Sequence, residues 1–303
     1  MKNNYLIKAI SFFLFLVLIV PFFNINVLAD TGPKPSVQID FLGLNNRKCF
    51  ATLLSKYESN GPNRAWDGKN EHINSYSIDR EIWEAFVNYK DSDGYYFLQV
   101  GFDISETEKI SWRYYPPNPF KILLYFPETD TYLSSGIYER YAFDSYYTVS
   151  ITDMTETNVS VIIVEKSYDY FSEIIGLLFR VVITVIIEII IALAFGFRKK
   201  NQLLFLLKVN VLTQIVLNFL LNYINYKSGS FYFLLNYVLF EIIVFVIEAV
   251  LYSSHLRKIN EVEQIIEGSF KTKKRFYVIY ALVANVVSFG FGIFISKIIP
   301  EMF

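Results

Sequence analysis

Seven polar side chains lie within long apolar stretches in the C-terminal half of this 303-residue chain. They are Glu188, Lys208, Gln214, Asn218, Glu241, Glu248 and Asn285. Carboxyl groups can bind and release protons or hold a cation, and amide groups can coordinate a cation or bridge helices. An ionisable side chain inside a bilayer costs about 2.5–3.5 kcal/mol on insertion scales, so it marks a candidate functional site. These seven residues form the predicted intramembrane polar site.

The amide residues of the second apolar stretch follow a regular spacing. Asn210, Gln214, Asn218 and Asn222 recur at every fourth position. Four residues advance about 400° around a helix, so these side chains stay on one inclined face. Such a stripe can line a hydrated path, or it can join neighbouring helices by hydrogen bonds worth about 0.6 kcal/mol each. The sequence leaves both interpretations open.

The carboxyl groups of the third stretch are also regularly spaced. Glu241, Glu248 and His255 lie seven residues apart, which keeps them near one face of a continuous helix. One hypothesis is a proton relay or a cation site that ends at the inner interface. The alternative is that burial keeps the carboxyl groups neutral, or that they form salt bridges with Lys208 and Arg180, where Lys208 would pair with Glu248. Depth predicts that four residues face one another near the middle of the bilayer: Glu188, Gln214, Glu241 and Asn285.

Four apolar stretches in residues 171–303 must position these side chains. They cover about residues 173–197, 203–225, 230–253 and 276–298. Each exceeds the roughly 20 residues that cross a bilayer as a helix. The sequence therefore predicts an all-α transmembrane bundle of four helices.

The N-terminal residues 1–29 have the pattern of a secretory signal peptide. Lys2 and Lys8 form a basic region, an apolar run covers residues 10–23, and small residues precede a cleavage site between Ala29 and Asp30. The alternative is that this segment is retained as an anchor helix. Export of the residues that follow makes the first span run from outside to inside.

The basic residues predict the same topology independently. The loops 198–202 and 254–275 are rich in lysine and arginine, whereas the loop near residues 226–229 carries one lysine. Because cytoplasmic loops carry the excess of basic residues, both basic loops are predicted inside. The sequence thus predicts a multi-pass protein of the plasma membrane, with residues 30–170 and the C-terminus outside the cytoplasm.

Residues 30–170 have the pattern of an exported β-rich domain. Runs rich in Val, Ile, Tyr and Phe are separated by turn residues; they cover residues 37–44, 50–54, 95–104, 110–115, 120–126, 146–151 and 159–164. One segment has helical spacing instead, with Ile82, Trp83 and Phe86 on one face. Short strands with one inserted helix predict an antiparallel β-sandwich-like domain.

Three segments carry a resemblance to a known group of proteins. They are residues 30–36, 119–126 and 138–146. Together they resemble a group of membrane proteins from low-GC Gram-positive bacteria, which join an exported N-terminal domain to a C-terminal helical bundle. The resemblance implies this architecture over most of the chain, and it implies no activity, ligand or catalytic residue.

The composition narrows the function classes. The 28 basic and 29 acidic residues argue against nucleic acid as a partner. With one cysteine and two histidines, the chain offers no recognisable catalytic motif, metal site or cofactor site, so we predict none. Our first hypothesis is a non-enzymatic membrane protein whose exported β domain binds a ligand or partner. The alternative is a small transporter or ion-coupled channel subunit. Under either hypothesis, we predict that the partners of the protein are the lipid bilayer and either another membrane protein or further copies of the same chain.

Overall fold

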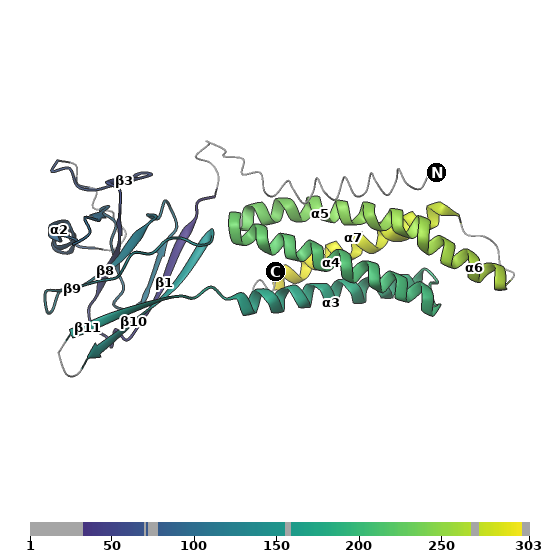
Figure 1. Ribbon diagram of the computed structural model, residues 1–303, viewed down its shortest axis with the longest axis horizontal. Helices are drawn as coiled ribbons and strands as arrows, with labels where there is room; N and C mark the ends of the chain where they lie inside the picture. The colour runs from purple at the N-terminus through teal and green to yellow at the C-terminus, as the bar shows by residue number, and fades with distance from the viewer. Residues whose placement is uncertain (1–32, 70, 72–77, 155–158, 268–272, 299–303) are drawn as a thin grey trace. The chain divides into compact units, whose positions relative to one another are not determined.

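A computed structural model of the protein describes residues 33–69, 71, 78–154, 159–267 and 273–298. The predicted signal peptide, its cleavage site at Ala29 and Asp30, and the C-terminal end lie outside the described residues. The chain forms two compact units: the β-rich one contains the residues up to Tyr168 together with Tyr226–Gly229, and the helical one contains the rest of the chain from Asp169 (Figure 1). The predicted fold class, a β domain followed by four long apolar helices, is confirmed.

The β unit contains two main sheets. The first has the strand order β11 (Val159–Lys166), β10 (Asp144–Met154), β1 (Ser36–Leu42), β7 (Lys109–Trp112). The second has the order β5 (Tyr96–Phe97), β2 (Phe50–Ser55), β8 (Phe120–Phe126), β9 (Thr131–Ser134), with β6 (Phe102–Asp103) also on β2. A two-stranded ribbon joins β3 (Ser59–Asn60) and β4 (Asn63–Arg64). All strand pairs are antiparallel except β1 and β10, which are parallel.

One hydrophobic core lies between the two sheets, as in a sandwich. Val37, Ile39 and Phe41 alternate along β1 and are almost fully buried in this core, where Leu53 of β2 and Ile122 of β8 also pack. The other face of the second sheet packs against α2 (Arg80–Asn88) through a separate cluster of apolar side chains. Because both of their faces are covered, β2 and β8 are buried along their whole length.

The segment 95–104 differs from its prediction as one strand. Gln99 has a φ of 59°, in the left-handed region that interrupts an extended strand. The segment therefore forms two short strands, β5 and β6, which pair with different ends of β2.

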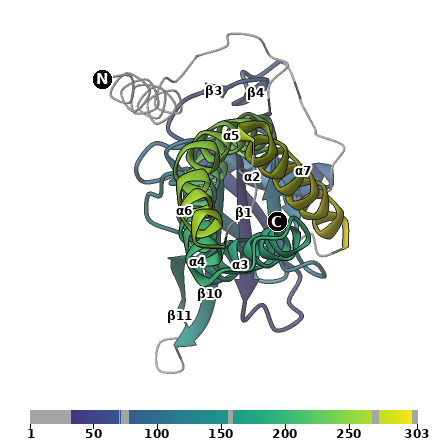
Figure 2. The ribbon, with the colours of Figure 1, turned by 90° about the vertical axis from the view of Figure 1, so that its right-hand side faces the viewer.

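The helical unit contains four helices long and apolar enough to cross a membrane. They are α3 (Tyr170–Ala194), α4 (Lys200–Ser228), α5 (Ser230–Leu251) and α7 (Lys274–Ile298). The helix α5 continues through a π-helical turn, η2 (Tyr252–Leu256), into α6 (Arg257–Glu267). Figure 2 looks along these helices, where α7 packs against α3 and α5.

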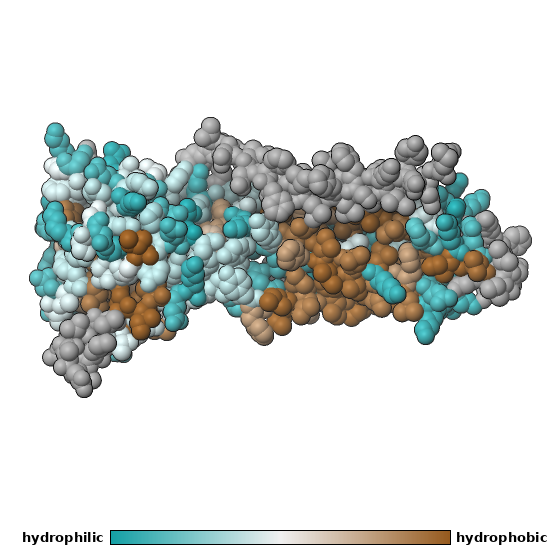
Figure 3. Space-filling model, in the orientation of Figure 1, coloured by the Kyte–Doolittle hydropathy of each residue, from teal (hydrophilic) through white to brown (hydrophobic). Residues whose placement is uncertain are grey.

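The outer surface of the helical unit is apolar. Large apolar side chains are more than half exposed on every long helix, among them Ile190, Leu212, Phe219, Leu234 and Val286. Figure 3 shows a largely brown, apolar surface over the helices that it draws in colour, with a few hydrophilic patches. Water would disfavour an apolar surface of this extent, whereas lipid would not. The helices are thus those of a multi-pass membrane protein in contact with a bilayer.

Candidate functional site

Polar side chains from all four long helices gather in the interior of the helical unit. The fully or nearly fully buried ones are Arg180 and Glu188 of α3, Asn210, Gln214 and Asn218 of α4, Glu248 of α5, and Asn285 and Ser288 of α7. Five of the seven predicted site residues are among them. Glu241 is partly buried, and Lys208 is exposed. The interior of the helical unit thus combines this polar cluster with two clusters of buried apolar side chains, whereas its exterior is apolar.

Glu248 joins three helices through its carboxylate. Thr213 Oγ1 of α4 donates a hydrogen bond to Oε1 at 2.9 Å, and Asn285 Nδ2 of α7 donates one to Oε2 at 2.6 Å. The Glu248 side chain is fully buried. Both carboxylate oxygens therefore have a donor from a different helix, and α5 is tied to α4 and α7 at this depth.

The π-helical turn determines which residue follows Glu248 on the buried face. Tyr252 is fully buried and its hydroxyl donates to Asn210 Oδ1 of α4. His255, which a continuous α-helix would bring near the same face, is exposed and shares a hydrogen bond of 3.0 Å with Ser254 Oγ. A π-turn places more residues in one turn than an α-helix does, so it rotates His255 away from the cluster.

Glu188 is the most unusual member of the cluster. Its side chain is fully buried, and neither carboxylate oxygen makes a hydrogen bond of normal geometry with a residue that the structure describes. The Ser288 hydroxyl lies close enough to interact with the carboxylate but donates to the Asn285 carbonyl oxygen at 3.1 Å. Glu241 and Glu248 also lie close enough to interact with it electrostatically. Three carboxyl groups from two helices thus share one interior, and one of them makes no hydrogen bond within the described part of the chain.

A small cavity lies beside one of these carboxyl groups, that of Glu241. Its volume is about 20 Å³ and its walls include Arg180, Gln214, Asn218, Glu241 and Ser288. A cavity needs roughly 10–15 Å³ to hold one water molecule. The cavity therefore has room for one water molecule or an ion of similar size, between an arginine and a glutamate.

The amide stripe of α4 combines both predicted roles. At its ends, Asn210 accepts from Tyr252, and Asn222 Oδ1 accepts from Arg180 Nη2 of α3 at 2.7 Å, so these residues join helices. In its middle, Gln214 and Asn218 hydrogen-bond to each other at 3.3 Å and line the cavity. The stripe therefore connects helices at its ends and contributes to a polar cavity between them.

Lys208 lies apart from the other predicted site residues. It is on the exposed side of α4, where it lines an apolar groove. Glu248 takes its hydrogen bonds from Thr213 and Asn285 instead. The predicted pairing of Lys208 with Glu248 is therefore wrong, because the two side chains project from α4 and α5 toward different surroundings.

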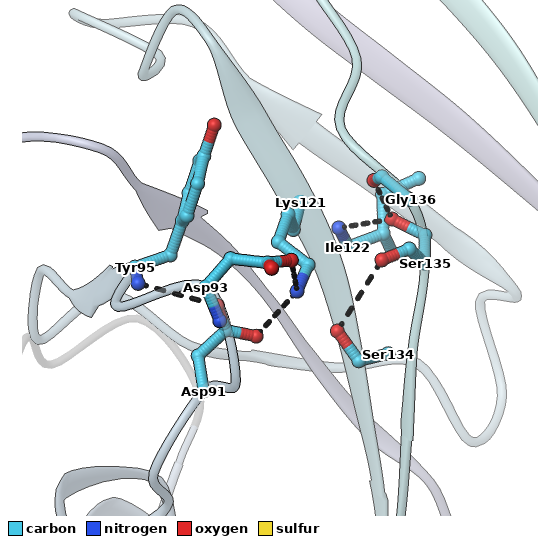
Figure 4. A network of polar contacts seen from close by, with 8 residues as sticks. All are labelled: Asp91, Asp93, Tyr95, Lys121, Ile122, Ser134, Ser135 and Gly136. Carbon is cyan, nitrogen blue, oxygen red and sulfur yellow. Dashed lines mark hydrogen bonds and ion pairs between the residues drawn. The ribbon is translucent and has the colours of Figure 1, made fainter.

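The β unit contains a second buried ionic cluster, which the sequence did not reveal. Lys121 of β8 is almost fully buried, and its Nζ lies 2.5 Å from Asp91 Oδ1 and 2.9 Å from Asp93 Oδ2. Figure 4 shows the ammonium group between these carboxylates. Asp91 Oδ2 also accepts backbone N–H groups from Asp93 and Tyr95. The turn at residues 91–94 is thus held onto the sheet by one lysine that pairs with two carboxylates.

The fold and the polar cluster together define the class: a multi-pass membrane protein with a β domain and a buried polar site between its helices. No family model, curated protein or solved structure matches the chain. The function of the protein is therefore inferred from the geometry of the polar cluster in the helical unit.

Proposed function

We propose that the helical unit binds a proton at the cluster of Glu188, Glu241 and Glu248 and transfers it across the membrane, as a small proton-coupled transporter or channel subunit. The observation that carries this proposal is the Glu188 carboxyl group, which is fully buried with both oxygens unpartnered among the described residues.

A purely structural role, in which the polar side chains join the helices by hydrogen bonds, does not account for this arrangement. Such a role requires that the buried polar groups be hydrogen-bonded to one another, because each one left without a hydrogen bond costs about 1–3 kcal/mol, and a charged one costs more. Here Gln214 Nε2, Glu241 Oε2 and Asn285 Oδ1 also lack partners within the described part of the chain. A proton on a carboxyl group, together with a water molecule in the cavity beside Glu241, would supply donors to carboxylate oxygens that lack one.

A proton fits the cluster better than a divalent metal ion. In the described ranges, no three acidic, histidine or cysteine side chains lie close enough together to hold a metal ion. A proton needs only one acceptor atom at each step, and chains of Glu, Asp and His side chains carry protons through pumps and transporters. Because four helices enclose little space, we infer that two or more copies complete the path.

The predicted topology gives this transfer a direction. We infer that the β unit is exported and that the basic loops 198–202 and 254–275 are cytoplasmic, on the signal-peptide pattern and the distribution of lysine and arginine. The cluster then lies between an exported surface and a basic cytoplasmic one. The binding of a ligand by the exported domain stays a prediction.

Reconstitution of the full chain into liposomes tests the proposal. With a pH-sensitive dye inside and an imposed pH gradient, the wild type should acidify the lumen faster than empty liposomes do. Glu188→Gln removes the titratable group and keeps its shape, so the flux should fall to the empty-liposome level. Glu165→Gln makes the same chemical change on an exposed strand residue and should leave the flux unchanged.

Two outcomes would contradict the proposal. One is a Glu188→Gln variant that keeps the wild-type proton flux. The other is a wild type, monodisperse and with native helix content, that carries no more protons than empty liposomes do. Parallel measurements with Na⁺ and K⁺ gradients identify a different ion if one is carried.

A further inference from the structure

A long apolar groove runs along the outer surface between α4 and α5. Its volume is about 540 Å³, and its walls include Leu212, Val216 and Leu220 of α4 and Ile243 and Ile247 of α5. Along α4 the lining residues extend from Phe205 to Leu220, which at 1.5 Å per residue is about 22 Å. One leaflet of a bilayer supplies about half of a hydrocarbon core of roughly 30 Å. The groove is therefore long enough for a complete acyl chain.

The walls of the groove suit an acyl chain better than another helix. Helices that associate in membranes do so through small residues, because glycine, alanine and serine let the backbones approach closely. The groove is lined by phenylalanine, leucine, isoleucine and valine, with Thr213 and Lys208 as its only polar side chains. A thin, flexible hydrocarbon chain can follow such a surface, whereas a helix about 10 Å wide cannot enter it.

Lys208 gives the groove a charged end. It makes no hydrogen bond or ion pair with any residue that the structure describes, and it is the only charged residue in the lining. It lies eight residues from Lys200, where α4 begins, or about 12 Å along the helix. A lysine at this depth extends its ammonium group toward the lipid headgroups. Under the predicted topology those headgroups belong to the inner leaflet.

We propose that this groove binds one anionic phospholipid of the inner leaflet, with an acyl chain along the groove and the phosphate on Lys208. Binding of the negatively charged phosphate accounts for the presence of a lysine in an otherwise apolar wall. The site also adjoins the polar cluster, because Thr213 both lines the groove and donates its hydroxyl hydrogen to Glu248. The proposal itself does not depend on proton transfer.

Native mass spectrometry of the full-length protein, released from detergent, tests the site. Phosphatidylglycerol should remain bound to the wild type in preference to phosphatidylcholine with the same chains. Lys208→Gln should reduce that preference about fivefold, the factor expected for one basic residue at an anionic surface. Lys200→Gln is the matched control, since it removes a lysine from the same helix outside the groove.

A second pair of variants tests the groove independently of the charge. Val216→Trp fills the groove and should abolish retention of both lipids, whereas Leu207→Trp changes an exposed residue of α4 outside the lining and should not. Equal retention of the two lipids by the wild type would overturn the proposal. So would equal effects of Lys208→Gln and Lys200→Gln. The proposal would also be overturned if the protein retained residues 1–29 and bound no lipid, because the N-terminal segment would then be the candidate occupant of the groove.

Discussion

The buried ion pair of the β unit provides a test of the structure that needs no functional assay. Lys121→Met keeps the length and apolar stem of the side chain but removes the cation, and it leaves the fully buried Asp91 carboxylate without its counter-charge. Breaking a buried pair in this way costs about 3–5 kcal/mol. The two backbone N–H groups that Asp91 also accepts offset part of this cost. Asp93 is half exposed and adds little. We therefore expect a loss near the lower limit, about 3 kcal/mol.

Tryptophan fluorescence of the full-length protein can measure this loss. All three tryptophans, Trp66, Trp83 and Trp112, lie in the β unit, so their emission reports its unfolding and not that of the helices. With an m-value of about 1–3 kcal/mol per molar urea, the unfolding midpoint should fall by about 1–3 M. Lys109→Met is the matched control: it removes an exposed pair with Asp40, which is worth at most about 1 kcal/mol.

A double variant shows whether the uncompensated charge is the cause. Asp91→Asn keeps an oxygen for the backbone N–H groups but removes the charge. Added to Lys121→Met, it should restore most of the lost stability. The reasoning is refuted if Lys121→Met unfolds at the same urea concentration as Lys109→Met, or if the double variant is less stable than Lys121→Met alone.

Three further predictions concern single side chains. Burial raises the pKa of the Cys49 thiol, the only cysteine of the chain, to about 12. A maleimide should therefore leave it unlabelled at pH 7 in the folded protein and label it in urea, as measured by mass spectrometry. Labelling of the folded protein would argue against this burial. Burial alone would lower the pKa of Lys121, but hydrogen bonds to the Asp91 and Asp93 carboxylates raise it above its ordinary value. The stability that the network adds is therefore complete below about pH 10.4 and is lost as the pH rises through the higher folded-state pKa; the wild-type urea midpoint should fall there more steeply than that of Lys121→Met. Thr213→Val removes a donor to the buried Glu248 and should destabilise the helical unit by about 1–3 kcal/mol in thermal melts followed by circular dichroism, whereas Thr213→Ser should not.

The sequence predicted those parts of the β unit that local pattern determines. The strands β1, β2, β8 and β10 were expected because their apolar residues alternate or run continuously, which follows directly from one or two covered faces. The strand β9 was not expected, since it exists through its pairing with β8, where Leu133 lies opposite Leu124. The buried position of Lys121 depends in the same way on a turn about 30 residues away in the sequence, and no local pattern shows that contact.

In the helical unit, too, the features that depend on local sequence were predicted and those that depend on distant contacts were not. Hydropathy over about 20 residues is a local property, so the four predicted spans end within a few residues of the ends of α3, α4, α5 and α7. Which faces of the helices meet depends on their rotation and on irregular turns. The π-helical turn at Tyr252–Leu256 moved His255 out of the cluster, and the rotation of α4 placed Lys208 on the outer surface. The π-helical turn has no signal in the spacing of the residues. The position of Lys208 does have one, because it lies two residues, or about 200° around the helix, from Asn210 at the start of the amide stripe.

The two buried ionic clusters of this protein show how the same physics separates structure from function. In the β unit, one lysine meets two carboxylates and every charge has a partner, so the cluster holds a turn on a sheet. In the helical unit, Glu188 lies beside two further carboxyl groups, and its oxygens make no hydrogen bond of normal geometry with the described residues. Burying an acid without a partner lowers stability at that position. Glu188 therefore does not stabilise the helical unit, which is why we propose that it binds and releases a proton.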